Sequence, residues 1–232
     1  MIKYNTEFFN NQTQGSLASA KAIIPIIMKI FSPKSVVDVG CGTGSWLSVF
    51  KKVGVKDILG IDGDYVKSEQ LLISKDEFIS KDLNRNFSIK KKYDVLLTVE
   101  VAEHIEPENA EVFINNLTKL SDIIIFSAAI PHQSGTHHVN EQWPNYWEEI
   151  FNRKDYIAVD YFRKRLWSNN DIRWWYRQNL LIFIKKNKIK KYPVLATDIS
   201  KDKLMSLVHP DNYISTKENQ ITYKVKKILK LA

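Results

Sequence analysis

The stretch VVDVGCGTGSW, residues 36–46, constrains the fold more than any other part of the sequence. A β-branched run leads into glycines at positions 40, 42 and 44, and an amphipathic segment follows directly. Glycines between a strand and a helix let the backbone pass close beneath a ligand while the first N–H groups of the helix face it. A dinucleotide fingerprint needs a glycine at its sixth position, which counting from Gly40 is Ser45. The stretch therefore predicts a cofactor site that is not a dinucleotide site.

Short apolar runs and amphipathic segments alternate along the rest of the chain. This alternation, with nearly continuous apolar strands, predicts a parallel sheet covered by helices on both faces. Pro25 is expected to kink the first helix or to divide it into two. The expected strands are 35–40, 57–62, a short one within 76–83, 93–99, 122–129, 157–167 and 178–186, and the expected helices are 15–31, 44–54, 107–120 and 144–156.

The spacing Asp38-x-Gly-x-Gly-x-Gly resembles the first motif of the class I S-adenosylmethionine-dependent methyltransferases. The resemblance covers most of residues 15–185 and includes several separated motifs. It implies a Rossmann-like α/β fold with a seven-stranded sheet whose last strand, 178–186, is antiparallel. We place the methyltransferase domain at residues 1–188 and a small basic C-terminal extension at residues 189–232.

The same resemblance assigns roles in binding S-adenosylmethionine. Asp38 would orient its amino group, directly or through water, and the three glycines would line its methionine part. Asp62 follows the second expected strand, where a carboxylate can accept hydrogen bonds from both ribose hydroxyls. In SKDLN, residues 80–84, Asp82 would accept from the adenine amino group and Leu83 would pack on the ring, although Asp82 taken alone is typical of a turn. The implied cofactor set is Asp38, Gly40, Gly42, Gly44, Asp62, Asp82 and Leu83.

A second cluster follows the fourth expected strand, in TVEVAEHIE, residues 98–106. The spacing of Glu100, Glu103 and His104 would put their side chains on one face of a helix. An acidic helix start is the ordinary explanation of such a run. The loop after the fifth expected strand adds His137 and His138, and in this topology it lies over the same sheet edge.

Carboxylates and imidazoles that converge suit Mg²⁺ or Mn²⁺, and less well Zn²⁺ or Fe²⁺. The run resembles that of metal-dependent RNA 2′-O-methyltransferases, which implies a metal set of Glu100, Glu103, His104 and His138, with His137 as the alternative to His138. A metal would lower the pKa of an acceptor hydroxyl, and His104 or His138 would take its proton. Alternatively, one histidine is the base and no metal is needed.

The charge of the chain is uneven. The net charge is +8, and residues 185–232 hold twelve lysines against four acidic residues, so the rest is close to neutral. Such a basic tail more often forms a solvated helix face than a nucleic-acid clamp. We expect no transmembrane segment, and the single cysteine, Cys41, favours a reducing compartment, hence a cytoplasmic location.

The acceptor is predicted from a further resemblance. The segment HVNEQWPNYW, residues 138–147, is similar to one in bacterial methyltransferases encoded with surface-polysaccharide genes. This implies O-methylation of a sugar, a sugar nucleotide or a capsule decoration, including a phosphoramidate. The first alternative is a metal-dependent RNA ribose 2′-O-methyltransferase, in which the basic tail would bind RNA. The second is a domain that binds the cofactor only to regulate a partner.

Overall fold

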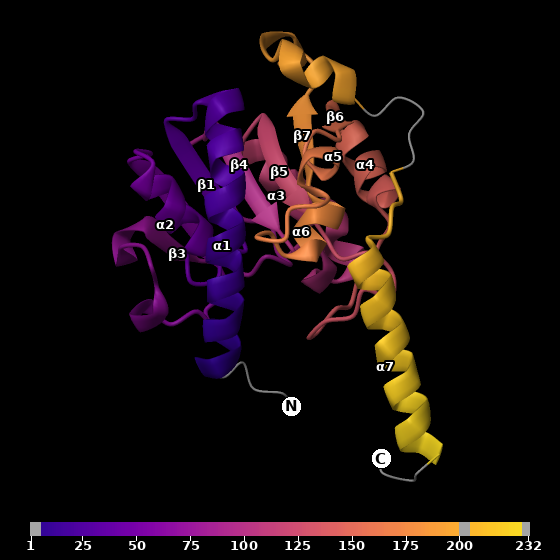
Figure 1. Cartoon of the computed structure of the whole chain (residues 1–232). Helices are drawn as coiled ribbons and strands as arrows, with labels where there is room; N and C mark the ends of the chain where they lie inside the picture. The colour runs from indigo at the N-terminus through magenta and orange to yellow at the C-terminus, as the bar shows by residue number, and fades with distance from the viewer. Residues whose placement is uncertain (1–5, 200–204, 229–232) are drawn as a thin grey trace.

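A computed structural model describes residues 6–199 and 205–228, and its centre is one seven-stranded sheet (Figure 1). The strand order is β3-β2-β1-β4-β5-β7-β6. The pairs from β3 to β5 are parallel, and β7 is antiparallel to both β5 and β6. The predicted seven-stranded sheet with a reversed last strand is confirmed. The strands are β1 Ser35–Val39, β2 Asp57–Asp62, β3 Phe78–Ser80, β4 Val95–Val99, β5 Ile123–Ser127, β6 Tyr156–Val159 and β7 Leu181–Lys185.

Helices cover both faces of the sheet, as the alternating pattern predicts. One apolar core joins the sheet to α1 and α2 through residues such as Ile24, Ile27 and Phe50. The other joins it to α3 and α4 through residues such as Phe113 and Trp147. The helices are α1 Thr6–Phe31, α2 Ser45–Lys52, α3 Ala110–Leu120, α4 Pro144–Asn152, α5 Arg163–Leu166, α6 Trp174–Asn179 and α7 Pro210–Ile228.

Two expected elements differ from the structure. Helix α1 continues through Pro25, so the proline does not divide it, and the alternative of a kink stays a prediction. The strand expected over 157–167 is too long, because β6 ends at Val159. Just beyond, Asp160 accepts hydrogen bonds of 2.9 and 2.8 Å from the guanidinium of the buried Arg163. An ion pair across three residues closes a turn, and α5 begins there instead of further strand.

The chain after β7 packs back onto the sheet domain. Ile199 forms an antiparallel bridge with Val159, and Leu195 and Met205 are buried. The buried Arg163 donates to the backbone oxygen of Met205 at 2.6 Å. Within residues 6–199 and 205–228, no helix has the length and apolar character needed to cross a membrane.

Candidate active site

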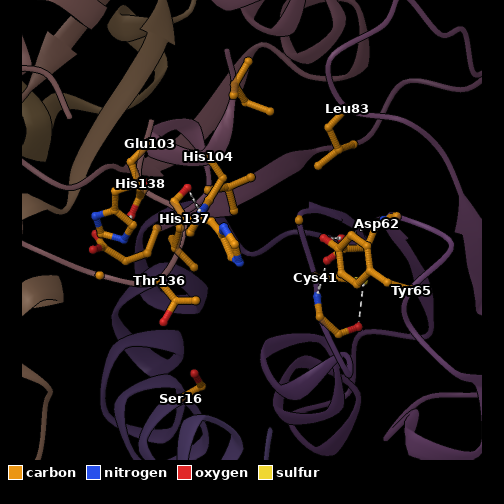
Figure 2. Close-up of a pocket in the computed structure, with 18 of the residues that line it drawn as sticks. Ser16, Cys41, Asp62, Tyr65, Leu83, Glu103, His104, Thr136, His137 and His138 are labelled. Atoms are coloured by element: carbon orange, nitrogen blue, oxygen red, sulfur yellow. Dashed lines mark hydrogen bonds and ion pairs between the residues drawn. The ribbon is translucent and has the colours of Figure 1, made fainter. Parts of the chain in front are cut away.

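A cavity of about 1240 Å³ opens at the edge of the sheet where β1, β2 and β4 end (Figure 2). Two groups of side chains lie at its opposite ends. The glycine end is defined by Gly40, Gly42, Asp62 and Leu83, and the histidine end by Glu103, His104 and His138. Asp38 lies in β1, behind the glycine end, and Gly44 lies outside the cavity lining.

The glycine turn has the backbone that only glycine adopts easily. Gly40, Gly42 and Gly44 all have positive φ, at 82°, 52° and 80°. A Cβ on Gly40 would lie 2.3 Å from Cγ2 of Val101, whereas a Cβ on Gly42 would meet open space. Gly44 faces Ile73, at 3.0 Å from where its Cβ would lie. Gly40 is therefore required by packing, and Gly42 leaves room for a ligand against bare backbone.

The carboxylate of Asp38 is buried and has no hydrogen-bond donor beside it among the described residues. Its side chain is 1% exposed, and neither carboxylate oxygen has a hydrogen-bond partner among the residues that the structure describes. Burial raises the pKa of Asp38 well above its ordinary value, and the nearby Asp62 raises it further. A buried carboxylate without a partner is costly, so this position fits a cationic group supplied by a ligand.

Asp62, at the end of β2, already has hydrogen bonds. Its Oδ2 accepts from the backbone N–H of Gly42 at 2.6 Å, and its Oδ1 accepts from that of Gly63 at 2.7 Å. The hydroxyl of Tyr65 also donates to Oδ1. Burial raises the pKa of Asp62, although these three donors counteract part of the shift. The carboxylate is held in place, with Tyr65 at the position that a ligand hydroxyl would take.

The residues expected at the adenine both line the cavity but differ in burial. Leu83 is buried, whereas the side chain of Asp82 is 53% exposed. Asp82 accepts from the backbone N–H of Asn84 at 2.9 Å and pairs with Arg85 at 3.0 Å. Asp82 thus makes the turn contact that its residue type suggests, while its position on the cavity wall leaves it open to a ligand.

Glu100 lies just after β4 in a left-handed conformation, with φ of 56°. Its carboxylate accepts from the side-chain amides of Gln133 at 2.9 Å and Asn179 at 3.1 Å. Burial raises its pKa despite these donors. The run expected to place Glu100, Glu103 and His104 on one helix face instead forms a 3₁₀ turn over Ala102–His104, so Glu100 lies apart. A non-glycine residue at positive φ is strained, and such strain is typical of functional sites.

Glu103, His104 and His138 converge at the histidine end, with one ligand atom from each within 4.8 Å of the others. Glu103 is 1% exposed, and both its carboxylate oxygens lack a hydrogen-bond partner in the described part of the chain. Burial raises the pKa of Glu103 well above its ordinary value and Glu100 raises it further, while the nearby backbone N–H groups of Glu103 and Ala129, too poorly aligned for ordinary hydrogen bonds, counteract part of the shift. Nε2 of His138 lies 4.0 Å from Oε1 of Glu103. The geometry leaves space between these atoms for a cation.

Both imidazoles are oriented by the loop after β5. Nδ1 of His138 donates to Oε1 of Glu141 at 2.8 Å, which leaves Nε2 facing Glu103. Nδ1 of His104 lies 3.1 Å from the backbone oxygen of His137 and therefore donates to it. A Cβ on Gly135 would lie 2.0 Å from Nε2 of His138, so the loop also needs a glycine there. Histidines that bind a metal through one ring nitrogen usually donate a hydrogen bond from the other ring nitrogen to a carboxylate or a backbone carbonyl.

His137 is placed differently from its neighbour. Its imidazole is exposed and outside the cluster, and its contribution to the histidine end is the backbone oxygen. Burial lowers the pKa of His104, and His138 beside it lowers it further. His104 is therefore neutral near pH 7, and its Nε2 can bind a metal or accept a proton.

The donor atoms fit a transition metal. One carboxylate and two imidazoles are ligands of Mn²⁺, Fe²⁺ or Zn²⁺, whereas Mg²⁺ prefers oxygen. The unpartnered oxygens of Glu103 would be satisfied by such an ion. The donor set thus fits a metal, and of the two ions that the sequence favours it suits Mn²⁺ better.

Several residues of the site were missed by sequence reasoning. Gln133 and Asn179 hold Glu100, and Gln178 donates to both of them, at 3.2 and 2.9 Å. Tyr65 on Asp62 was also missed. The sequence gives little signal for Gln133 and Asn179, because their contacts with Glu100 span 33 and 79 positions, whereas Tyr65 is only three residues from Asp62 and could have been considered.

Comparisons with known proteins agree with this geometry. A family model described as "Methyltransferase domain" matches residues 12–178. No curated protein sequence matches the chain.

Three solved structures show similar folds. DesVI of Streptomyces venezuelae is 13% identical with a TM-score of 0.57, over 77% of this chain and 95% of that one. The plantazolicin methyltransferase BpumL in complex with SAH is 17% identical with a TM-score of 0.55, over 78% and 88%. The small RNA methyltransferase HEN1 is 17% identical with a TM-score of 0.53, over 72% of this chain and 25% of that one. At these identities the likeness shows the fold alone.

Proposed function

The chain belongs to the methyltransferase-domain family, and from that premise we propose that it transfers the methyl group of S-adenosylmethionine to a hydroxyl of a glycosyl acceptor with the help of a divalent metal. The observation that carries the proposal is the buried carboxylate of Glu103, without a hydrogen-bond partner among the described residues, beside two oriented histidines. The site geometry supports the proposed roles of individual residues, and the likeness of residues 138–147 to surface-polysaccharide enzymes supports the proposed class of acceptor.

The glycine end would hold the cofactor. Asp38 would accept hydrogen bonds from its amino group, because both carboxylate oxygens need a donor. The bare backbone at Gly40 and Gly42 would lie along its methionine part, and Asp62 would accept from the ribose hydroxyls. Leu83 would pack on the adenine beside Asp82. The SAH bound to BpumL supports the same cofactor.

The histidine end would hold the metal and the acceptor hydroxyl. Glu103, His104 and His138 would be the metal ligands. Glu100 would keep its hydrogen bonds from the side-chain amides of Gln133 and Asn179. When bound, the metal lowers the pKa of an acceptor hydroxyl, which is otherwise a poor nucleophile. Should no metal bind, Nε2 of His104 is the proton acceptor, since its lowered pKa keeps the ring neutral.

The acceptor is proposed to be a sugar, a sugar nucleotide or a capsule decoration such as a phosphoramidate. Half-buried Trp174 and Trp175 line the cavity and offer apolar surface to a sugar ring. Capsule polysaccharide biosynthesis is the corresponding process. The boundary between the domain at 1–188 and the extension at 189–232, and the cytoplasmic location, stay predictions.

A labelling experiment tests the proposal. Methyl-labelled S-adenosylmethionine is incubated with the protein and separate metabolite, polysaccharide and RNA fractions, each with and without chelator. Label is expected in a sugar or polysaccharide fraction, and it should disappear with chelator and return with Mn²⁺. Label that survives chelator removes the metal from the proposal.

The second candidate is an RNA ribose 2′-O-methyltransferase. The specific observation that favours it is the set of Glu103, His104 and His138, together with the fold likeness to the small RNA methyltransferase HEN1. Label found only in the RNA fraction would replace the first proposal with this one. Cofactor binding with no label in any fraction would favour a domain that only regulates a partner.

A further inference from the structure

Helix α7 exposes apolar side chains along much of its length. Tyr213, Ile214 and Ile221 are 59%, 52% and 61% exposed. Ile214 and Ile221 are seven residues apart, about two helical turns, so they share one side of the helix. Figure 1 shows α7 extending away from the sheet, so this side lies in solvent. We call these three side chains the α7 apolar face.

The start of α7 is fixed to the domain by buried polar contacts. Asn212 is 4% exposed and donates to Oε1 of Gln178 at 3.1 Å. Asp211 accepts from Arg177 at 2.7 Å. At about 100° per residue, Asn212 lies roughly opposite Ile214 and Ile221 around the helix, so its contact with the domain leaves these two side chains exposed. The α7 apolar face therefore stays exposed even though the start of the helix is attached to the domain.

The surroundings of this face are positively charged. Lys217 lies between the exposed apolar residues, with Nζ 5.6 Å from the ring centre of Tyr213. The sequence places further lysines at positions 224, 226 and 227 of the same helix, whose acidic residues are Asp211 and Glu218. Asp211 is already paired with Arg177. The charge left to the helix is positive, which favours an anionic partner.

We propose that α7 binds an anionic lipid surface, with the α7 apolar face entering the headgroup boundary and Lys217 at the lipid phosphates. A helix with exposed apolar side chains among lysines is the arrangement that lies in a membrane interface. RNA explains the lysines but not the isoleucines, since aliphatic side chains neither stack on bases nor bind phosphates. Ser215 lines the cavity, so docking through α7 would bring the cavity mouth to that surface. The inference does not depend on which acceptor is methylated.

Co-sedimentation of the full chain with vesicles tests the proposal. Binding is expected to phosphatidylcholine vesicles that contain phosphatidylglycerol, and to be at least about tenfold weaker to pure phosphatidylcholine. Salt should weaken it only in part, because the apolar contacts remain. Calorimetry with S-adenosylmethionine on the same protein separates failure of this inference from failure of the proposed function.

Matched variants make the result specific. The double substitution Ile214→Ser and Ile221→Ser is expected to weaken vesicle binding about tenfold or more while cofactor binding is unchanged. The control is Val53→Ser with Val194→Ser, two apolar residues that are 44% and 50% exposed outside α7, and it should bind vesicles like the parent. Equal binding by both double variants would overturn the proposal. So would binding to a labelled RNA oligonucleotide without binding to vesicles, or a dimer in solution that the α7 variant converts to a monomer.

Discussion

At or just behind each end of the cavity, a carboxylate that has hydrogen-bond partners lies beside one that has none among the described residues. At the glycine end Asp62 is held by backbone N–H groups and a tyrosine, while Asp38 has no partner among the described residues. At the histidine end Glu100 is held by two amides, while Glu103 is the one without. We call Asp38 and Glu103 the open carboxylates. A carboxylate with hydrogen-bond partners is fixed in position and defines the geometry of the site. An open carboxylate, buried without a partner, indicates where a ligand would supply positive charge.

The largest expected effect comes from Glu103→Gln. This variant should lose Mn²⁺ binding and at least about 100-fold in methyl transfer, because even residues behind a metal ligand contribute 10–100-fold. The metal-free protein should become more stable near pH 7, since a buried unpaired charge is removed. Calorimetry with Mn²⁺ and thermal unfolding measure both.

The exposed Glu108 supplies the control for this prediction. Glu108→Gln should leave metal binding, methyl transfer and stability unchanged. Full activity of Glu103→Gln would contradict the proposal that the open carboxylate at the histidine end binds a metal needed for methyl transfer.

Asp38→Asn should affect the other end. S-adenosylmethionine is expected to bind roughly 10–100-fold more weakly, which is the usual contribution of a hydrogen bond between charged groups. Mn²⁺ binding should be unchanged, because Asp38 lies behind the glycine end. Unchanged cofactor affinity would show that this open carboxylate does not bind the amino group.

The pH dependence of this variant follows from the raised pKa of Asp38. A carboxyl group whose pKa is raised by folding favours the folded state below its unfolded pKa of about 3.9, and this contribution is lost as pH rises through the folded pKa. Ligand-free Asp38→Asn should therefore be more stable than the parent at pH 7, with the difference shrinking toward acid. Urea unfolding across this range measures it. A difference that grows toward acid would contradict the sign.

A smaller effect is expected from Gly135→Ala. The added Cβ would lie 2.0 Å from Nε2 of His138, so the imidazole must move. Metal affinity should fall about tenfold, in the range for disturbed metal-ligand orientation, with cofactor affinity unchanged. Ser134→Ala is the control, since the neighbouring residue contributes to Glu141 through its backbone N–H. Equal metal affinities in the two variants would mean that His138 is not a ligand.

The smallest expected effect is that of Tyr65→Phe. The hydroxyl of Tyr65 occupies an acceptor position on Asp62 that a ribose hydroxyl would need under the proposed function, and two backbone N–H groups still hold the carboxylate without it. Cofactor affinity should rise about threefold, the scale of one neutral hydrogen bond. Weaker binding would mean that Tyr65 supports the site instead.

Local sequence was enough to predict the glycine turn and the order of the strands, although not the end of β6. The β1 run, the glycines and α2 are consecutive, so their spacing carries the geometry. The separation of Glu100 from Glu103 was not predictable in this way. It depends on a positive φ and on amides from residues 133 and 179, which only the folded chain brings together.

The loop after β5 shows the same limit. His137 and His138 are adjacent, and the choice between them depends on backbone turns that Glu141 organises by accepting from His132 and Ser134. The contacts of the C-terminal extension are also long-range, because Leu195 and Met205 are buried in the two apolar cores of the sheet. Long-range packing, which has no local periodicity, decided both.

Calorimetry on Asp38→Asn and Glu103→Gln, with S-adenosylmethionine and Mn²⁺ titrated separately into each, tests most directly whether the open carboxylates mark two distinct sites. Asp38→Asn is expected to lose cofactor affinity and keep Mn²⁺ binding, and Glu103→Gln is expected to do the reverse. If both variants bind both ligands like the parent protein, or if each loses both, the open carboxylates do not mark two distinct sites.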